Sequence, residues 1–265
     1  MYNTRNYVPI TTADGSMTLL DQDSELHFRS LRGARSESEY VFFDSSRLNT
    51  QPFPWRVLEL GLGTGLNFLV TAQHHLRHQK ENPGARLEYH VVEASPLPIR
   101  ALKALQHESQ FAAELCALLS ESVSHSQMGQ VSQVHKSGIS IFLYHDFWQN
   151  VKLPESLQVQ AIYHDPFGPK DNPDCWTVEC FQWSGKHLSE KGRLVTYAAN
   201  TPLRRAMVEA GLFIGSQKGS QQKREMTVAA SQLSALKGLH NLEILRKKTY
   251  YLSCLDRRPS KADIA

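Results

Sequence analysis

The stretch YHDPFGPKDNPDCW, residues 163–176, places an aspartate and several aromatic side chains around a stiff connection. Three prolines fall within eight positions. Each proline fixes its own φ and lacks a backbone donor, so the segment is predicted to be an irregular loop. The carboxylate of Asp165 and a carbonyl held by the turn could accept the N–H bonds of an amine, while Phe167 covers the group attached to it. The alternative is a turn whose aspartate merely caps the next helix.

A second candidate site is the segment LELGLGTGLNF, residues 58–68, between a short apolar run and a helical pattern. Its glycines are Gly61, Gly63 and Gly65. Glycine lets a backbone turn sharply and approach a ligand, and a helix N-terminus favours an anionic group. The dinucleotide-binding pattern needs a small residue at position 66, which is Leu66 here, so a nicotinamide dehydrogenase is disfavoured. With Glu59 before it, the segment resembles the first motif of class I S-adenosylmethionine-dependent methyltransferases.

Acidic residues end the next two predicted strands. Glu93 ends the strand predicted over 87–93, and Asp146 follows the strand predicted over 138–145. The resemblance to class I methyltransferases implies that Glu93 accepts the ribose hydroxyl protons and that Asp146 receives the adenine amino group. Either residue alone could be an ordinary solvated loop residue. Their order on successive strands, together with the glycine segment, favours a site for S-adenosyl-L-methionine.

From Trp55 onward the pattern alternates between strands and helices. Strands are predicted over 56–60, 87–93, 138–145, 159–164 and 192–198, helices over 65–79, 97–107, around 110–120, 175–189 and 201–211, and a closing strand pair over 212–217 and 224–230. Such alternation implies a mostly parallel sheet covered on both faces, with ligands bound outside the carboxyl ends of the strands.

The predicted fold class is therefore α/β: a Rossmann-like class I methyltransferase with a mostly parallel, doubly wound sheet and a terminal antiparallel strand pair. Residues 1–54 are assigned to a small N-terminal β-rich extension. In it, MTLL, ELHF and EYVFF have the composition of short strands separated by turn signals. Residues 55–265 are assigned to the methyltransferase domain.

Composition excludes several classes of protein. The chain has 265 residues, 41% of them hydrophobic and 21% charged, which argues against collagen-like and disordered chains. No stretch of about 18 apolar residues occurs, and the N-terminus lacks the apolar core of a signal peptide. The four cysteines form no C-x-x-C pair, which fits a cytoplasmic chain without a disulfide framework. A net charge of +3 permits nucleic-acid binding without arguing for it.

Longer motifs resemble one methyltransferase family. Together, LELGLGTGLNFL, VEASPLP, DPFGPKDNPDCWT and KGSQQKREMTVA resemble the methyltransferase part of the MnmC family, and SESEYVFFDSSRL resembles the segment that precedes its glycine loop. The resemblance covers roughly residues 16 to 230. It implies methylation of 5-aminomethyl-2-thiouridine at the tRNA wobble position, with S-adenosyl-L-methionine as cofactor. It also implies that a separate enzyme supplies the aminomethyl precursor.

The resemblance also assigns roles to residues. It implies that the cofactor is held by Glu59, Gly61, Gly63, Gly65, Asn67, Glu93 and Asp146. Asp165 would receive the substrate amine and could take its proton, in a turn stiffened by Pro166 that is similar to the D-P-P-Y-type loops of amino-methylating enzymes. Phe167 and Trp176 would wall the pocket. Substrate contacts are further implied for Lys223, Arg224 and Glu225.

This chain departs from the family on the substrate side. It reads HDPFGP where many members are closer to LDGFAP, and GSQQKREM lacks the aromatic-glycine pair often found before that motif. Two alternatives therefore stay open: a methyl- or aminopropyl-transferase for a free small amine, and a non-catalytic nucleotide- or RNA-binding module of the same fold. Neither a metal site at His74 and His78 nor a catalytic thiol at Cys175 is expected. The basic stretch LRKKTYYLSCLDRRPSK could hold RNA phosphates.

Overall fold

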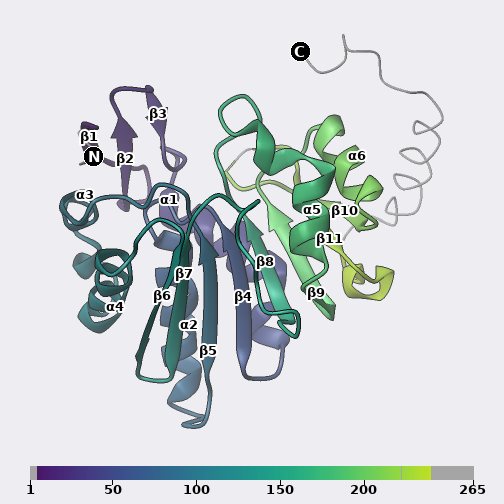
Figure 1. The fold of residues 1–265 in the computed structure, drawn as a ribbon, viewed down its shortest axis with the longest axis horizontal. Coiled ribbons are helices and arrows are strands. Elements are labelled where there is room, and N and C mark those ends of the chain that lie inside the picture. Colours follow the sequence, from purple (N-terminus) through teal and green to yellow (C-terminus); the bar gives the residue numbers. More distant parts are fainter. Residues whose placement is uncertain (1–4, 222, 240–265) are drawn as a thin grey trace.

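A single large sheet forms the centre of the computed structural model, which describes residues 5–221 and 223–239 (Figure 1). The strands of this sheet are β4 Trp55–Leu60, β5 Leu87–Val92, β6 Gln130–Lys136, β7 Ile139–His145, β8 Val159–His164, β9 Leu188–Thr196, β10 Phe213–Gln217 and β11 Met226–Ala230. Their order is β10-β11-β9-β8-β4-β5-β7-β6. The five strands from β9 to β7 are mutually parallel.

Antiparallel pairing is confined to the two edges of the sheet. β11 pairs antiparallel with both β9 and β10, which confirms the predicted terminal strand pair. β6 pairs antiparallel with β7 at the other edge and was not predicted. Its sequence QVSQVHK is largely polar and buries only two side chains. An edge strand with so little burial carries almost no hydrophobic signal.

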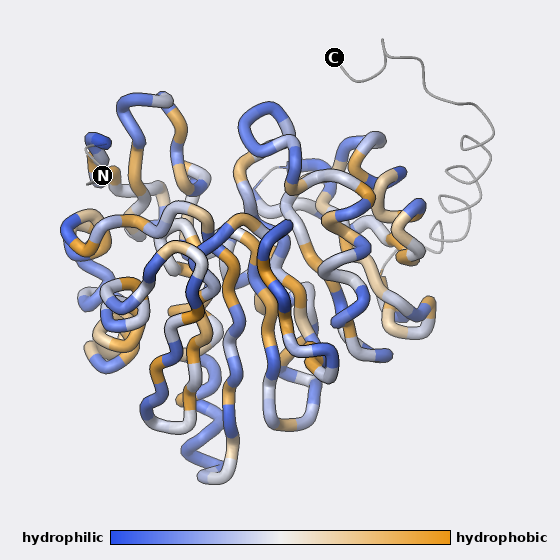
Figure 2. Tube along the Cα trace, in the orientation of Figure 1, coloured by the Kyte–Doolittle hydropathy of each residue, from blue (hydrophilic) through white to orange (hydrophobic). Residues whose placement is uncertain are grey.

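Helices cover both faces of the sheet, as the alternating pattern predicts. One face carries α2 Leu66–Gln79, α3 Ile99–Ala104 and α4 Ala113–Ser124, and the other carries α5 Val178–Gly185 and α6 Thr201–Glu209. Successive strand residues point to opposite faces, so Val57 joins the first apolar core and Leu58 the second. Figure 2 shows the apolar residues concentrated along these strands.

Two predicted helices are shorter than expected. The helix predicted over 175–189 is α5 alone, preceded by a 3-10 turn over Pro173–Trp176, while Leu188 already begins β9. Thr177 caps α5 by accepting a hydrogen bond from the Cys180 amide. The helix predicted over 97–107 is reduced to α3. Local propensity did not resolve the ends of α5, because packing sets both the turn that precedes this helix and the strand β9 that follows it.

The N-terminal segment begins as a separate three-stranded antiparallel sheet of β1 Tyr7–Thr11, β2 Met17–Asp21 and β3 Leu26–His27. It continues as α1 Ala34–Glu37 and a π-helix over Ser38–Asp44. The strand expected in EYVFF is therefore wrong. Phe42 packs against Tyr163 and Phe43 against Trp55, and burying consecutive aromatic side chains against the body of the protein overrides their strand propensity.

Within the described part of the chain, no helix is both long and apolar enough to cross a bilayer. The basic stretch near the C-terminus that the sequence singles out lies outside the described residues.

Candidate functional site

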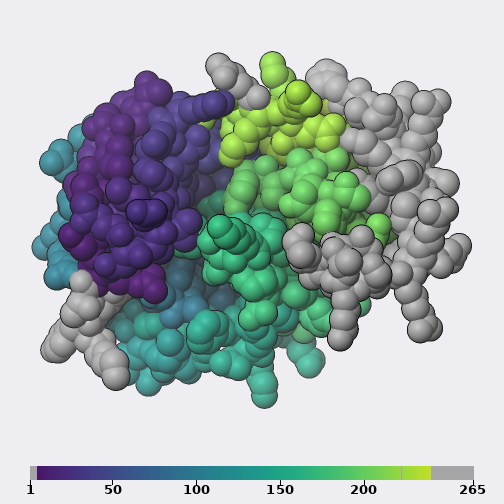
Figure 3. Space-filling view, turned by 90° about the horizontal axis from the view of Figure 1, so that it is seen from above, coloured from purple at the N-terminus to yellow at the C-terminus, as the bar shows by residue number. Residues whose placement is uncertain are grey.

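The carboxyl ends of β4, β5, β7 and β8 meet beside the N-terminal segment, and a cavity of about 810 Å³ lies between them. Viewed from above, the purple N-terminal segment lies beside the teal-green segment that follows β8 (Figure 3). Ligand pockets typically measure about 300–1,000 Å³, so the cavity has room for a nucleoside-sized ligand with an adjoining reactive group. The extension supplies part of the lining, including Tyr7 and Phe28.

The glycine segment between β4 and α2 forms one wall. Gly61 has a φ of 88°, and a Cβ added there would lie 2.9 Å from the Asp165 carbonyl oxygen. Gly63 also has a positive φ, of 50°. Only glycine adopts such conformations at little cost, and only a residue without a side chain permits this contact. The backbone can thus approach both a ligand and the neighbouring loop, which fits the S-adenosyl-L-methionine site expected from the sequence.

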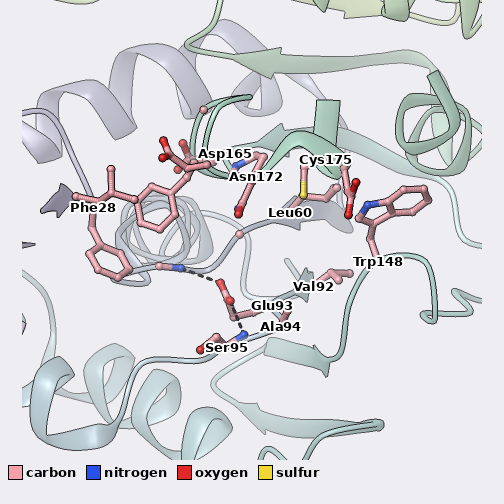
Figure 4. A pocket seen from close by; sticks show the side chains of 18 of the residues that line it. Phe28, Leu60, Val92, Glu93, Ala94, Ser95, Trp148, Asp165, Asn172 and Cys175 are labelled. Atoms are coloured by element: carbon pink, nitrogen blue, oxygen red, sulfur yellow. Dashed lines mark hydrogen bonds between the residues drawn. The ribbon is translucent and has the colours of Figure 1, made fainter. Parts of the chain in front are cut away.

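Glu93 lies at the end of β5 and lines the cavity (Figure 4). The Leu62 and Gly63 amides donate to its Oε2 at 2.9 and 3.3 Å, and the Ser95 amide donates to its Oε1 at 2.8 Å. This carboxylate therefore fixes the glycine segment to the end of the neighbouring strand. It is also a charged hydrogen-bond acceptor in the cavity wall.

Asp146 lies after β7 and lines the same cavity. Its Oδ1 accepts hydrogen bonds from the Phe147 amide at 2.7 Å and from Asn150 Nδ2 at 2.8 Å. Phe147 also lines the cavity and is 58% exposed, which is unusual for a phenylalanine. Beside Asp146, an exposed aromatic ring offers a flat apolar surface for a base.

Asp165 lines the cavity from the loop after β8, next to the glycine segment. Its Oδ2 forms an ion pair with Arg29 Nη1 at 2.5 Å and accepts a hydrogen bond from Asn67 Nδ2 at 2.9 Å. Burial raises the pKa of Asp165 to about 7, although Arg29, Asn67 and Lys223 act in the opposite direction. A carboxyl group with such a pKa can take and release a proton near neutral pH.

Glu59 lies beneath the cavity rather than in it. Its side chain is fully buried, with Oε1 accepting from Asn67 Nδ2 at 2.7 Å and Oε2 from the Tyr89 hydroxyl at 2.8 Å. Burial, together with the nearby Asp165 carboxylate, raises its pKa to about 8. Asn67 therefore links the carboxylates of Glu59 and Asp165 beneath the cavity. The direct cofactor contact predicted for Glu59 and Asn67 is corrected, because both side chains are buried.

Two side chains hold the backbone of the loop after β8: Tyr197, which lines the cavity, and Trp176, which lies outside it. The Tyr197 hydroxyl donates to the Pro166 carbonyl at 2.9 Å, and Trp176 Nε1 donates to the Phe167 carbonyl at 2.8 Å. Trp176 packs on the fully buried ring of His164 and does not line the cavity. The predicted place of Trp176 in the pocket wall is corrected. Trp176 stabilises the loop through its hydrogen bond to the loop backbone.

Phe167 lines the cavity itself, in edge-to-face contact with Phe28 of the extension at 5.2 Å between ring centroids. Gly65 is the N-cap residue of α2, and a Cβ there would collide with Leu119. This glycine is therefore needed for helix packing and does not line the cavity.

The KREM segment is divided between two sides of the molecule. Lys223 lines the cavity, pairs with Glu37 Oε1 at 2.8 Å and lies 5.1 Å above the Tyr197 ring centroid. Arg224 and Glu225 instead line a second hollow, and Glu225 pairs with Arg204. The structure thus brings only Lys223 of these three predicted substrate residues to the site.

Several residues of the site were missed by sequence reasoning. Tyr197 directly follows β9, so the rule that ligands bind at strand ends could have identified it. Arg29, Phe28 and Glu37 had no such signal, because the extension shows no recognisable periodicity. Among the described residues, no group of three or more histidine, cysteine or acidic side chains is arranged to hold a metal. Burial raises the pKa of Cys175 to about 11, so this cavity-lining thiol is protonated at neutral pH.

Comparison with known proteins agrees with this geometry. A family profile described as S-adenosyl-L-methionine-dependent methyltransferase matches residues 110–232. The tRNA 5-methylaminomethyl-2-thiouridine biosynthesis bifunctional protein MnmC of Pseudoalteromonas atlantica is 27% identical over 226 residues, which are 81% of this chain and 32% of that protein. Its counterpart in Vibrio campbellii is 29% identical over 80% of this chain and 33% of its own length. The chain is similar to the MnmC methyltransferases.

The chain shares its fold with a solved structure, MnmC2 of Aquifex aeolicus. The two superpose with a TM-score of 0.71 at 24% identity, over 94% of this chain and 77% of the other. The fold class predicted from the sequence is confirmed. The chain spans about a third of the length of the two MnmC relatives.

Proposed function

We propose that this protein transfers a methyl group from S-adenosyl-L-methionine to the aminomethyl nitrogen of 5-aminomethyl-2-thiouridine at the tRNA wobble position. The observation that carries the proposal is the contact between the two halves of the site. Gly61 lies against the backbone of Asp165 and Pro166, so the loop suited to the cofactor and the carboxylate suited to an amine border one cavity. The names of the MnmC relatives support this choice of substrate.

One side of the cavity would bind the cofactor, and the other would orient the amine. Gly61, Gly63 and Glu93 would hold the cofactor, with Asp146 and Phe147 at its base. Bound S-adenosyl-L-methionine supplies an electrophilic methyl group: the new carbon–nitrogen bond uses the amine lone pair, and the broken carbon–sulfur bond leaves its electron pair on sulfur. Asp165 would orient the amine through an N–H bond and accept the proton that the nitrogen loses.

The protein needs a substrate that already carries the aminomethyl group. A separate enzyme that installs this group on the wobble uridine is therefore part of the proposal, and tRNA is the proposed partner. The proposed activity is a cytoplasmic one.

The decisive experiment is incubation with labelled S-adenosyl-L-methionine and bulk tRNA that contains unmethylated 5-aminomethyl-2-thiouridine, followed by nucleoside analysis. Label should appear in the methylated nucleoside with the wild-type protein and not with Asp165→Asn. Absence of label with the wild-type protein, under conditions in which it binds the cofactor, would reject the proposed substrate.

A free small amine is the second candidate, favoured by the acidic side chains Glu37, Asp171 and Asp174 around the cavity. It predicts methyl or aminopropyl transfer to a polyamine without RNA, which a parallel incubation with labelled donor and spermidine would detect. Cofactor binding without turnover in either assay would indicate a non-catalytic binding module.

A further inference from the structure

The dipeptide Phe28–Arg29 connects the N-terminal extension to the glycine segment and to the loop after β8. Phe28 contacts Phe167 of the loop after β8, and its Cδ1 lies 3.4 Å from the position of a Cβ at Gly63. Arg29 reaches the carboxylate of Asp165. Both residues line the cavity. Two consecutive residues of the extension thus contact the glycine segment, the substrate loop and the carboxylate between them.

Arg29 engages only one oxygen of that carboxylate. Asp165 Oδ2 contacts both Arg29 Nη1 and Asn67 Nδ2. Oδ1 has no recorded partner among the described residues, and Asp165 lines the cavity. Held at Oδ2 from two directions, the carboxylate cannot rotate freely, and Oδ1 is left for a group that enters the cavity.

The Arg29 side chain is itself fixed. It is only 4% exposed, and its guanidinium carbon lies 5.5 Å from the centroid of the Phe42 ring. Phe42 belongs to the π-helix that packs on the body of the protein. A buried guanidinium held by an aromatic ring is a rigid donor, because its planar fork loses little further freedom when it pairs.

Charged and titratable groups approach Asp165 from every element around it. They are Arg29 of the extension, Glu37 of α1, Glu59 of β4, Tyr197 after β9 and Lys223 of the segment before β11. Lys223 is paired with Glu37, and Glu59 is buried in contact with Asn67 and Tyr89. Arg29 is therefore the cation in direct contact with Asp165.

We propose that Arg29 is a positioning residue for methyl transfer: it keeps the Asp165 carboxylate anionic and turns Oδ1 toward the substrate amine. This inference deepens the proposed function and rests on it for the identity of the amine. The guanidinium also disfavours a second positive charge nearby, so a neutral amine with a free lone pair is favoured over an ammonium ion at the same position. The extension is then part of the reaction site.

The test compares variants that remove the charge with variants that keep it. Arg29→Met retains an apolar stem against Phe42 but has no charge. Its rate should fall about tenfold or more at pH 7, and the acidic limb of its pH–rate profile should move about 1–3 pH units higher, because an opposite charge at this distance lowers a carboxyl pKa by that much. Arg29→Lys should keep the limb within about one pH unit of wild type.

Arg35→Met is the matched control. Arg35 belongs to the same extension, forms an ion pair with Glu39 and lies over the Phe111 ring at 4.8 Å, but does not line the cavity. This variant should lower thermal stability and leave the acidic limb in place. An equal shift in Arg35→Met, or no shift in Arg29→Met, would overturn the assignment. If Arg29→Met does not fold, Arg29→Gln and Arg29→Lys provide the same contrast.

A second measurement needs no methyl acceptor. In protein with ¹³C-labelled aspartate, the carboxyl resonance of Asp165 is the one that Asp165→Asn removes. Its apparent pKa should be about 1–3 units higher in Arg29→Met than in wild type. If wild-type protein fails to methylate tRNA, the proposed substrate fails while this titration still decides the role of Arg29. An unchanged titration would reject that role even if tRNA is methylated.

Discussion

The two sides of the cavity are built in different ways. The proposed cofactor side consists of backbone amides, glycines and the carboxylates of Glu93 and Asp146, which come from the ends of strands β4, β5 and β7. The substrate side is built from side chains far apart in the sequence: Arg29, Asn67, Asp165 and Tyr197. A site made of backbone requires a local sequence pattern, whereas a site made of distant side chains requires the whole fold. The two sides should therefore respond differently to substitution.

The largest effect is expected on the substrate side alone. Asp165→Asn removes the proton acceptor while preserving the shape of the side chain, so kcat should fall about 10²- to 10⁴-fold, the usual contribution of a positioned acid or base. Affinity for S-adenosyl-L-methionine, measured by titration calorimetry, should change less than about twofold, because no strand end on the cofactor side is altered.

Asp171→Asn is the control for this substitution, since Asp171 is an exposed acidic residue that lines the same cavity. It should retain most of the transfer activity. Equal losses of cofactor affinity and turnover in Asp165→Asn would show that the two sides are not separable.

Gly61→Ala should damage both sides together, because the added Cβ would lie 2.9 Å from the Asp165 carbonyl oxygen. The positive φ adds a strain of about 1–3 kcal/mol. We expect roughly tenfold losses in both cofactor affinity and kcat, with a lower melting temperature.

Gly211→Ala separates conformational strain from steric collision. Gly211 has a φ of 87°, close to the 88° of Gly61, but nothing lies within 4 Å of its Cβ position. It should lose thermal stability and keep its activity. If Gly211→Ala inactivates the protein as strongly as Gly61→Ala, the contact between the loops is not the cause.

Glu93→Gln should affect the cofactor side alone. A charged acceptor contributes about 1.5–3 kcal/mol through its hydrogen bonds, and glutamine keeps part of them, so affinity for S-adenosyl-L-methionine should fall roughly tenfold. At saturating cofactor, kcat should stay near the wild-type value. A fall in kcat with unchanged affinity would assign Glu93 to the transfer step instead.

The smallest effect is expected on stability, and it concerns the buried carboxyl group of Glu59 beneath the cavity. The pKa of Glu59 is raised from 4.5 to about 8 by burial, so the fold favours the protonated form. Its stabilising contribution is complete below the unfolded pKa of 4.5 and is lost as pH rises through the folded value of about 8. Glu59→Gln resembles the protonated form, so its melting temperature should fall less than that of wild type between pH 5 and pH 8.

Glu190→Gln, at an exposed position of β9, is the control and should leave this pH dependence as in wild type. A wild-type melting temperature that rises over the same interval would contradict the assignment to Glu59.

Most of the sheet could be predicted, and the exceptions share a cause. Strands such as β4 and β8 consist mostly of apolar residues because both of their faces are buried. The edge strand β6 and the π-helix over Ser38–Asp44 were missed or misassigned, because their conformation depends on what packs beside them. Glu59 and Trp176 were expected in the cavity. In the structure both are buried outside it, where Glu59 bonds to Asn67 and Trp176 bonds to the backbone of the loop after β8.

By itself the sequence determined the fold class, the glycine segment and the acidic residues at the strand ends, since each depends on a few neighbouring residues and a fixed periodicity. Only the tertiary structure decided that Arg29 meets Asp165, that Asn67 joins Asp165 to Glu59, and that Lys223 and Arg224 face different hollows. The physical reason is that a buried ion pair joins side chains from segments far apart in the sequence. No local sequence pattern shows which distant segments come into contact.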